Sequence, residues 1–414
     1  MTYPTADKLS RIAALRPASP RCLQADTARS SGSDQLCGLV GGECVRNRFG
    51  EHVRARRKLS RPKAEQMSGE ALHLIAPGSG DAFCDWSKWL FLDTETTGLA
   101  GGTGTYAFLI GLAWWEIDGF VVEQHFMGEH SQEPSLLLDV AQHLENRPVL
   151  VTFNGKSFDW PLLQTRFQMT RIGRIPEPGA HLDLLHPARR LWKLNLPSVA
   201  LAQLEQHVLQ LDRGPDIPSS TIPQLFFDFL RGGPPAPVAQ IFHHNQMDLS
   251  GLALLAQHMN RILRDPENGS SHAGELFGIS RLLQLRGNDA LAGRMYQKAL
   301  DTGLPEAAEQ TARRELALLS KRAKNYELSN ALWGKLLDSS AGGLRAYEEL
   351  AIYYEHRANR PEKAAELAHE ALIRLQQAFH DGRISVSQYR LWNENLHHRL
   401  TRLNAKAAVP HGLV

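Results

Sequence analysis

An apolar strand that ends in two acidic residues constrains the fold of this chain more than any other feature. Residues 91–98 read Phe-Leu-Asp-Thr-Glu-Thr-Thr-Gly after an apolar run. Side chains alternate along a strand, so Asp93 and Glu95 point to the same face. Two carboxylates on a buried strand are unfavourable unless a cation neutralises them. Because carboxylate pairs suit Mg²⁺ or Mn²⁺, these residues are candidate metal ligands, although a solvated strand end would explain such a pair on its own.

A second acidic position follows another predicted strand. Residues 149–153 are predicted to form a buried strand, Asn154 ends that strand, and Asp159 opens a helix predicted over residues 158–167. An acid in the first turn also stabilises a helix through its dipole or as a cap. Its place next to a strand end, combined with the first motif, makes Asp159 a further candidate ligand.

The third motif opens a long apolar helix predicted over residues 245–263. Asp248 is expected near its start, and His244 lies four residues earlier, on the same helix face. A histidine here can take a proton from water at neutral pH. The alternative interpretation is an ordinary surface histidine at the entry of a helix.

Residues 86–262 alternate between strand-like and helix-like segments. An apolar run enters Asp93, residues 104–126 predict a hairpin that turns at Asp118-Gly119, and residues 134–144 have helical spacing. Strands followed by helices predict an α/β domain with a mixed sheet and flanking helices.

Residues 270–405 have a different character, because glycine and proline become rare and Ala, Leu, Glu and Arg dominate. Similar segments place Ala299, Leu336 and Ala371 in register, at separations of 37 and 35 residues. A period of this size with two helices per unit resembles tetratricopeptide repeats, and an irregular helical bundle is the alternative. Either arrangement is suited to packing or to binding a protein partner.

Residues 1–85 show little periodicity and are expected to be mostly disordered, apart from a short helix near residues 63–74. Residues 46–63 carry eight basic side chains against one acid. Such a run can hold nucleic-acid phosphates, or it can be a solvated tail, and the two interpretations are compatible.

The bulk properties favour an ordinary multi-domain protein. A chain of 414 residues is too long for a single core. Its apolar stretches are too short to predict a membrane span. The four cysteines form no Cys-x-x-Cys pair, so neither a disulfide framework nor a zinc site is expected from them, and a reducing cytoplasm fits best.

Taken in this order, the three motifs resemble those of the DEDD exonucleases, which have a ribonuclease H-like fold. The resemblance implies that four acids bind two divalent cations, Mg²⁺ or Mn²⁺. Those acids map to Asp93, Glu95, Asp159 and Asp248 in this chain. Residues 101–111, 183–186 and 244–249 are further similar to the bacterial YprB-like ribonuclease H-like domain proteins. The similarity covers about residues 88–260.

The resemblance also implies an activity, the 3′-to-5′ trimming of DNA or RNA, with a histidine as the base that activates water. His243 and His244 are both candidates, and His244 fits the finer family pattern. Asn154, Lys156 and Thr96 are candidate substrate-binding residues, although a solvated turn explains Lys156 equally simply. A non-catalytic nucleic-acid-binding scaffold and a structure-selective endonuclease remain the alternatives.

Overall fold

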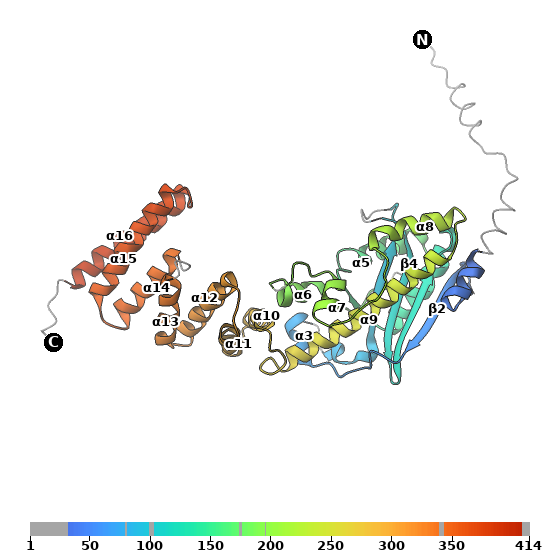
Figure 1. Cartoon of the computed structure of the whole chain (residues 1–414), viewed down its shortest axis with the longest axis horizontal. Helices are drawn as coiled ribbons and strands as arrows, with labels where there is room; N and C mark the ends of the chain where they lie inside the picture. The colour runs from blue at the N-terminus through green and yellow to red at the C-terminus, as the bar shows by residue number, and fades with distance from the viewer. Residues whose placement is uncertain are drawn as a thin grey trace, which may run out of the picture. The chain divides into compact units, whose positions relative to one another are not determined.

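The computed structural model describes residues 32–78, 81–98, 103–173, 176–194, 196–338 and 343–407. Contacts divide the chain into two units, and each is described by itself (Figure 1). The first unit holds the residues up to His186 together with Ala200–Asn260. The second takes Arg261 onward and also Pro187–Val199, which the sequence analysis placed in the α/β domain.

A sheet of seven strands, counted over the described residues, forms the centre of the first unit (Figure 1). In chain order the strands are β1 Gly42–Asn47, β2 Gly50–Leu59, β3 Trp89–Thr96, β4 Ala107–Glu116, β5 Gly119–Phe126, β6 Val149–Thr152 and β7 Ala180–Asp183. In space their order is β1-β2-β5-β4-β3-β6-β7. In this spatial order, each pair of neighbouring strands from β1 through β2, β5 and β4 to β3 is antiparallel. Strands β3, β6 and β7 run parallel to one another. The predicted mixed sheet is confirmed.

The predicted hairpin and its flanking elements are also present. Strands β4 and β5 pair up to Glu116 and Gly119, next to the expected turn. Because β3, β6 and β7 are parallel, their carboxyl ends meet at one edge of the sheet. The acids that follow these strands are therefore brought to the same edge.

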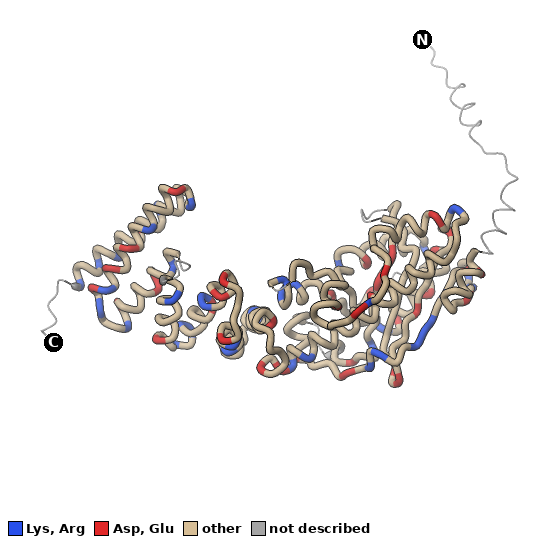
Figure 2. Tube along the Cα trace, in the orientation of Figure 1, with Lys and Arg blue, Asp and Glu red and all other residues tan. Residues whose placement is uncertain are grey.

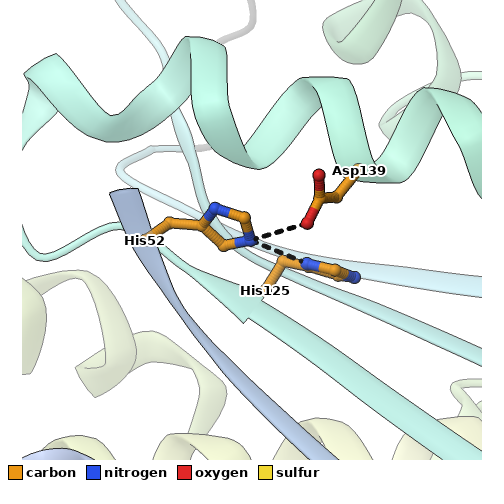
Figure 3. Close-up of side chains that lie close together, drawn as sticks. All are labelled: His52, His125 and Asp139. Carbon is orange, nitrogen blue, oxygen red and sulfur yellow. Dashed lines mark hydrogen bonds and ion pairs between the residues drawn. The ribbon is translucent and has the colours of Figure 1, made fainter. Parts of the chain in front are cut away.

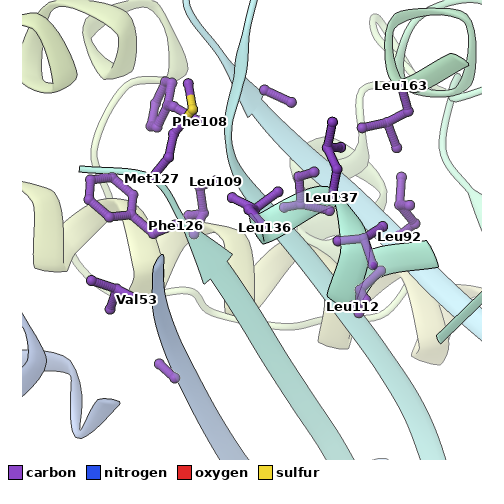
Figure 4. Close-up of a cluster of buried hydrophobic side chains, with 14 of the residues drawn as sticks. Val53, Leu92, Phe108, Leu109, Leu112, Phe126, Met127, Leu136, Leu137 and Leu163 are labelled. Carbon is purple, nitrogen blue, oxygen red and sulfur yellow. The ribbon is translucent and has the colours of Figure 1, made fainter. Parts of the chain in front are cut away.

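Helices cover both faces of the sheet. The helices that begin in the first unit are α3 Gly69–Ile75, α4 Glu133–Asn146, α5 Asp159–Thr170, α6 Leu185–Trp192, α7 Leu201–His207, α8 Ile222–Leu230 and α9 Ala236–Arg264. The Phe126 ring of β5 contacts Phe226 of α8 and Phe242 of α9. The preceding residue, His125, points the opposite way, toward α4. Figure 4 shows how leucines of β3, β4, α4 and α5 join one buried cluster.

The structure corrects the expectation of disorder for residues 42–59. These residues form β1 and β2, and β2 pairs with β5 from Val53 to Leu59. Lysines and arginines line β2 (Figure 2). Cations of both strands pair with carboxylates: on β1 Arg46 with Glu51, and on β2 Arg54 with Glu43, Arg56 with Glu116, and Lys58 with Glu116 and Asp118. The predicted short helix appears as α3, and residues 1–31 lie outside the described residues.

The second unit is helical, as predicted. Its remaining helices are α10 Ala273–Leu285, α11 Asp289–Thr302, α12 Glu306–Arg322, α13 Tyr326–Asp338, α14 Gly343–His356, α15 Pro361–His380 and α16 Val386–Ala407. In the described part of the chain, every helix lacks the combination of length and apolar character that a membrane span requires.

Three turns repeat along this unit at the places where the sequence carries turn signals. Gly287 separates α10 from α11, Lys324 separates α12 from α13, and Asn359 separates α14 from α15. All three residues adopt a positive φ, of 77°, 62° and 50°. The three positions aligned by the sequence repeat are all buried: Ala299, Leu336 and Ala371. The internal repeat therefore corresponds to successive helical hairpins.

The close approach of α10 to α6 predicts a stability difference between two glycine substitutions. A Cβ at Gly278 would lie 2.6 Å from Leu191 Cα and 2.7 Å from the Arg190 carbonyl oxygen. We expect Gly278→Ala to lower the free energy of unfolding by about 1–3 kcal/mol, measured by urea denaturation of the full chain. Gly293→Ala is the matched control. Its Cβ would meet only Leu316, at 3.7 Å, and helix propensity should stabilise it by about 0.5–1 kcal/mol. Equal effects would contradict the packing argument.

Candidate functional site

Four acids predicted from sequence converge at the carboxyl edge of β3. Asp93 and Glu95 lie on β3, and Asp159 is the first residue of α5. Asp248 comes from α9, which begins at Ala236, so this acid lies well inside the helix and not near its start as expected. The Thr94 hydroxyl donates to Asp159 Oδ1 at 2.5 Å. This hydrogen bond links the ends of β3 and α5.

Asn245 fastens α9 to the strand that carries Asp93. Asp93 lies opposite Gly111 of β4, which lies opposite Gln124 of β5. Asn245 Nδ2 donates to Asp93 Oδ2 at 2.8 Å, and Gln124 Nε2 donates to Asn245 Oδ1 at 2.9 Å. A Cβ at position 111 would lie 2.1 Å from Asn245 Oδ1, so only glycine leaves room for this amide.

The crowded acids hold their protons unusually tightly. Burial, followed by the charges of Asp248 and Asp159, raises the pKa of Glu95 to about 8. Burial is also the main reason why the pKa of Asp159 rises to about 6. The pKa of Asp93 rises well above its usual value because of burial and the charges of Asp248, Glu95 and Asp159. A divalent cation would relieve this repulsion.

A single arginine balances part of this negative charge. The Arg213 guanidinium forms ion pairs with Glu205 and Asp248, and a third with Asp216 at 3.2 Å. Its side chain is only 11% exposed. Gly251 leaves room for Glu205, because a Cβ there would lie 1.6 Å from Glu205 Oε1. Arg213 therefore joins the loop before α8 to α7 and α9.

His244 lies between two carboxylates. Its Nδ1 is 2.8 Å from Asp216 Oδ1, and its Nε2 is 3.5 Å from Asp248 Oδ2. Although burial opposes it, the hydrogen bond from His244 lowers the pKa of Asp216, so this carboxylate is ionised and can only accept. The proton therefore sits on Nδ1. In the neutral ring, Nε2 then carries a lone pair directed toward the acids. His243, by contrast, is exposed.

Glu95, His244 and Asp248 form a compact set of possible ligands. One ligand atom from each residue lies within 4.8 Å of the others. Two carboxylates and one imidazole nitrogen suit Mg²⁺ or Mn²⁺ better than they suit a soft metal ion.

A cleft of about 480 Å³ opens beside Asp93 and Asp159. Two of the predicted substrate-binding residues, Thr96 and Asn154, line it together with Phe158, whose ring is 53% exposed. The third, Lys156, has an exposed side chain, and its backbone N–H donates to Asp183 Oδ2 at 3.0 Å. The lining of this cleft therefore combines carboxylates with exposed aromatic surface.

Comparison with known proteins agrees with this architecture. Residues 90–260 match the family described as RNase_H superfamily. The chain is 33% identical over 286 residues to the uncharacterized protein YprB of Bacillus subtilis (strain 168), a match that covers 68% of each chain. This chain belongs to the ribonuclease H superfamily. Its fold is of a nuclease type, and its acidic groups are possible metal ligands.

Sequence reasoning about this superfamily member missed the groups that organise the acids. Arg213 and Asp216 lie in a loop between α7 and α8, where no periodic pattern marks them. Asn245 and Gln124 are neutral, so no charge pattern singles them out. In the folded chain Asn245 donates to Asp93, and Gln124 donates to Asn245. Asp183, also buried, receives the backbone N–H groups of Asn154, Lys156 and Leu185 and so supports the turn after β6.

The raised pKa of Glu95 predicts that stability depends on pH when divalent cations are absent. The folded state keeps a proton on Glu95 up to about pH 8, whereas the unfolded chain loses it near pH 4.5. Stability should therefore fall as pH rises toward 8, by at most about 1.4 kcal/mol per pH unit for each retained proton. Histidines with a lowered pKa, such as His52, make stability rise with pH, but only below about pH 6.5. The effect of Glu95 is therefore measured without this opposing effect between pH 7 and pH 8.

Thermal unfolding in EDTA at pH 7 and pH 8 measures this effect. We expect a lower Tm at pH 8, restored by Mn²⁺ because the bound cation replaces the protons. Glu95→Gln should flatten the dependence. A Tm that rises from pH 7 to pH 8 in EDTA would be incompatible with the crowding described above.

Proposed function

We propose that this chain is a metal-dependent nuclease that hydrolyses phosphodiester bonds of DNA or RNA, acting as a 3′-to-5′ exonuclease. The observation that carries the proposal is the convergence of Asp93, Glu95, Asp159 and Asp248 with His244 at one edge of the sheet. Acids gathered in this way are unfavourable for folding unless they serve a cation. Membership of the ribonuclease H superfamily supports the same conclusion.

The donor set fits two divalent cations, Mg²⁺ or Mn²⁺. Such ions lower the pKa of an attacking water and offset the charge that develops on the phosphate and on the leaving oxygen. Asp93 would be one ligand of these ions, because the charges of all three other acids act on it. Glu95, Asp159 and Asp248 would complete the ligand set.

His244 is our candidate for the general base. Its Nε2 would take the proton of the attacking water, while Asp216 keeps the other proton on Nδ1 and orients the ring. His244 is 6% exposed and faces Asp248, whereas His243 is exposed to solvent. These positions favour His244 over His243.

The nucleic-acid end would enter the cleft beside Asp93. Thr96 and Asn154 are candidate contacts for the substrate, and the exposed Phe158 ring could stack on a base. The helical hairpins of the second unit are a candidate surface for a protein partner. A scaffold that binds without cutting remains the second candidate, and an endonuclease the third.

An assay with end-labelled single-stranded DNA and RNA tests the proposal. We expect shortening from the 3′ end with Mg²⁺ or Mn²⁺, none with EDTA, and loss of cleavage without loss of binding in Asp93→Asn. Internal fragments would indicate an endonuclease. Binding without any cleavage would favour the scaffold, and full activity in Asp93→Asn would exclude the proposed site.

A matched pair of histidine variants tests the base. We expect His244→Gln to lower kcat by about 10²-fold or more, because the proton acceptor is lost, and His243→Gln to leave kcat nearly unchanged. Asp216→Asn should lower kcat with little change in KM and alter the pH–rate profile, while Asp216→Glu should restore part of the rate. The reverse order for the two histidines would assign the base to His243.

A further inference from the structure

A second group of metal-binding side chains lies on the sheet face that α4 covers, away from the acidic cluster. His52 of β2 and His125 of β5 are both fully buried, and Asp139 of α4 faces them (Figure 3). His52 Nε2 lies 3.0 Å from His125 Nδ1 and 3.6 Å from Asp139 Oδ2. One ligand atom of each residue therefore lies within 4.8 Å of the other two.

The atoms on the other side of each of these three residues lie near polar neighbours. His52 Nδ1 lies 2.9 Å from the Ser135 hydroxyl, and Asp139 Oδ1 accepts from Asn47 Nδ2 at 3.0 Å. His125 Nε2 lies 3.2 Å from Glu123 Oε1. Histidines that bind metals usually direct their second ring nitrogen to a carboxylate or a hydroxyl, and this contact orients the ring.

This arrangement leaves three electron pairs facing one another. If Nδ1 of His52 carries its proton beside Ser135 and Nε2 of His125 carries its proton beside Glu123, the two inner nitrogens are both acceptors. Asp139 adds a carboxylate oxygen to them. A metal ion binds the lone pair of a neutral imidazole nitrogen, so this tautomer presents both rings in the form that a ligand needs.

We propose that His52 Nε2, His125 Nδ1 and Asp139 Oδ2 bind a divalent transition-metal ion of the zinc type. Their separations of 3.0 and 3.6 Å bracket the roughly 3.4 Å expected between ligands of a tetrahedral zinc ion. Two imidazoles and one carboxylate suit zinc, whereas the acidic cluster suits Mg²⁺ or Mn²⁺. Asp139, whose side chain is 17% exposed, marks the side from which water can take the fourth position.

Such an ion would tie three elements together. β2 precedes the segment that matches the superfamily, while β5 and α4 lie within it. The ion therefore fastens the β1–β2 hairpin to the sheet and to α4. This role does not depend on the nuclease activity proposed above.

The test is metal analysis of the full-length chain after treatment with a chelating resin and reloading with Zn²⁺ or Co²⁺. We expect one tightly held ion per chain, and with Co²⁺ the intense visible absorption of four-coordinate cobalt. Asp248→Asn should keep this ion, since it alters only the acidic cluster. Asp139→Asn and His52→Gln should lose it, each checked for folding by circular dichroism.

His143→Gln is the matched control. His143 Nε2 contacts Glu123 Oε1 at 2.8 Å, so its loss disturbs a neighbour of the site and not a ligand. We expect this variant to keep the ion, with affinity lowered by at most about 10–100-fold.

Three results would overturn the proposal. These are no stoichiometric ion in the unaltered chain, full affinity in folded Asp139→Asn and His52→Gln, or loss in His143→Gln with retention in Asp139→Asn. If both ligand variants fail to fold, the cobalt spectrum of the Asp248→Asn chain decides. Four-coordinate bands at one equivalent support the site, and their absence excludes it.

Discussion

The repulsion among acids at the end of β3 is the constraint on which the first unit is built. Asp93, Glu95 and Asp159 all have raised pKa values, because burial and mutual charge disfavour their ionised forms. Arg213 supplies one compensating charge, and Asn245 supplies a hydrogen bond to Asp93. Gly111 and Gly251 make room for the buried groups Asn245 and Glu205. The folded chain therefore tolerates an unfavourable cluster of acids, whose oxygens are possible metal ligands.

The main features of the fold could be predicted from sequence because they depend on local patterns. The hairpin of β4 and β5, the helix α4 and the helical second unit follow directly from periodicity and turn residues. The β1–β2 hairpin could not be predicted. Its strands carry many charged residues, and they are held by pairing with β5 and by ion pairs such as Arg54 with Glu43. The pairing with β5 joins segments that are remote in sequence.

The candidate site was predictable only in part, for a similar reason. Asp93 and Glu95 stand out because charge on an apolar strand needs an explanation. Arg213 and Asp216 reach His244 and Asp248 from an irregular loop, so only the folded chain brings them there. The sequence likewise does not indicate that the histidines of β2 and β5 form a group, because they are 73 residues apart and each looks like an ordinary strand residue.

The repeated left-handed turns at Gly287, Lys324 and Asn359 have a consequence for how the helical unit folds. Each turn joins two helices that are neighbours in sequence, so most contacts within a hairpin join residues that are separated by only a short stretch of chain. Low contact order of this kind favours rapid folding. Because each hairpin contacts chiefly its neighbours, the unit is quasi-one-dimensional, and one hairpin can unfold while more distant ones stay folded. Its cooperativity is set by the interfaces between successive hairpins.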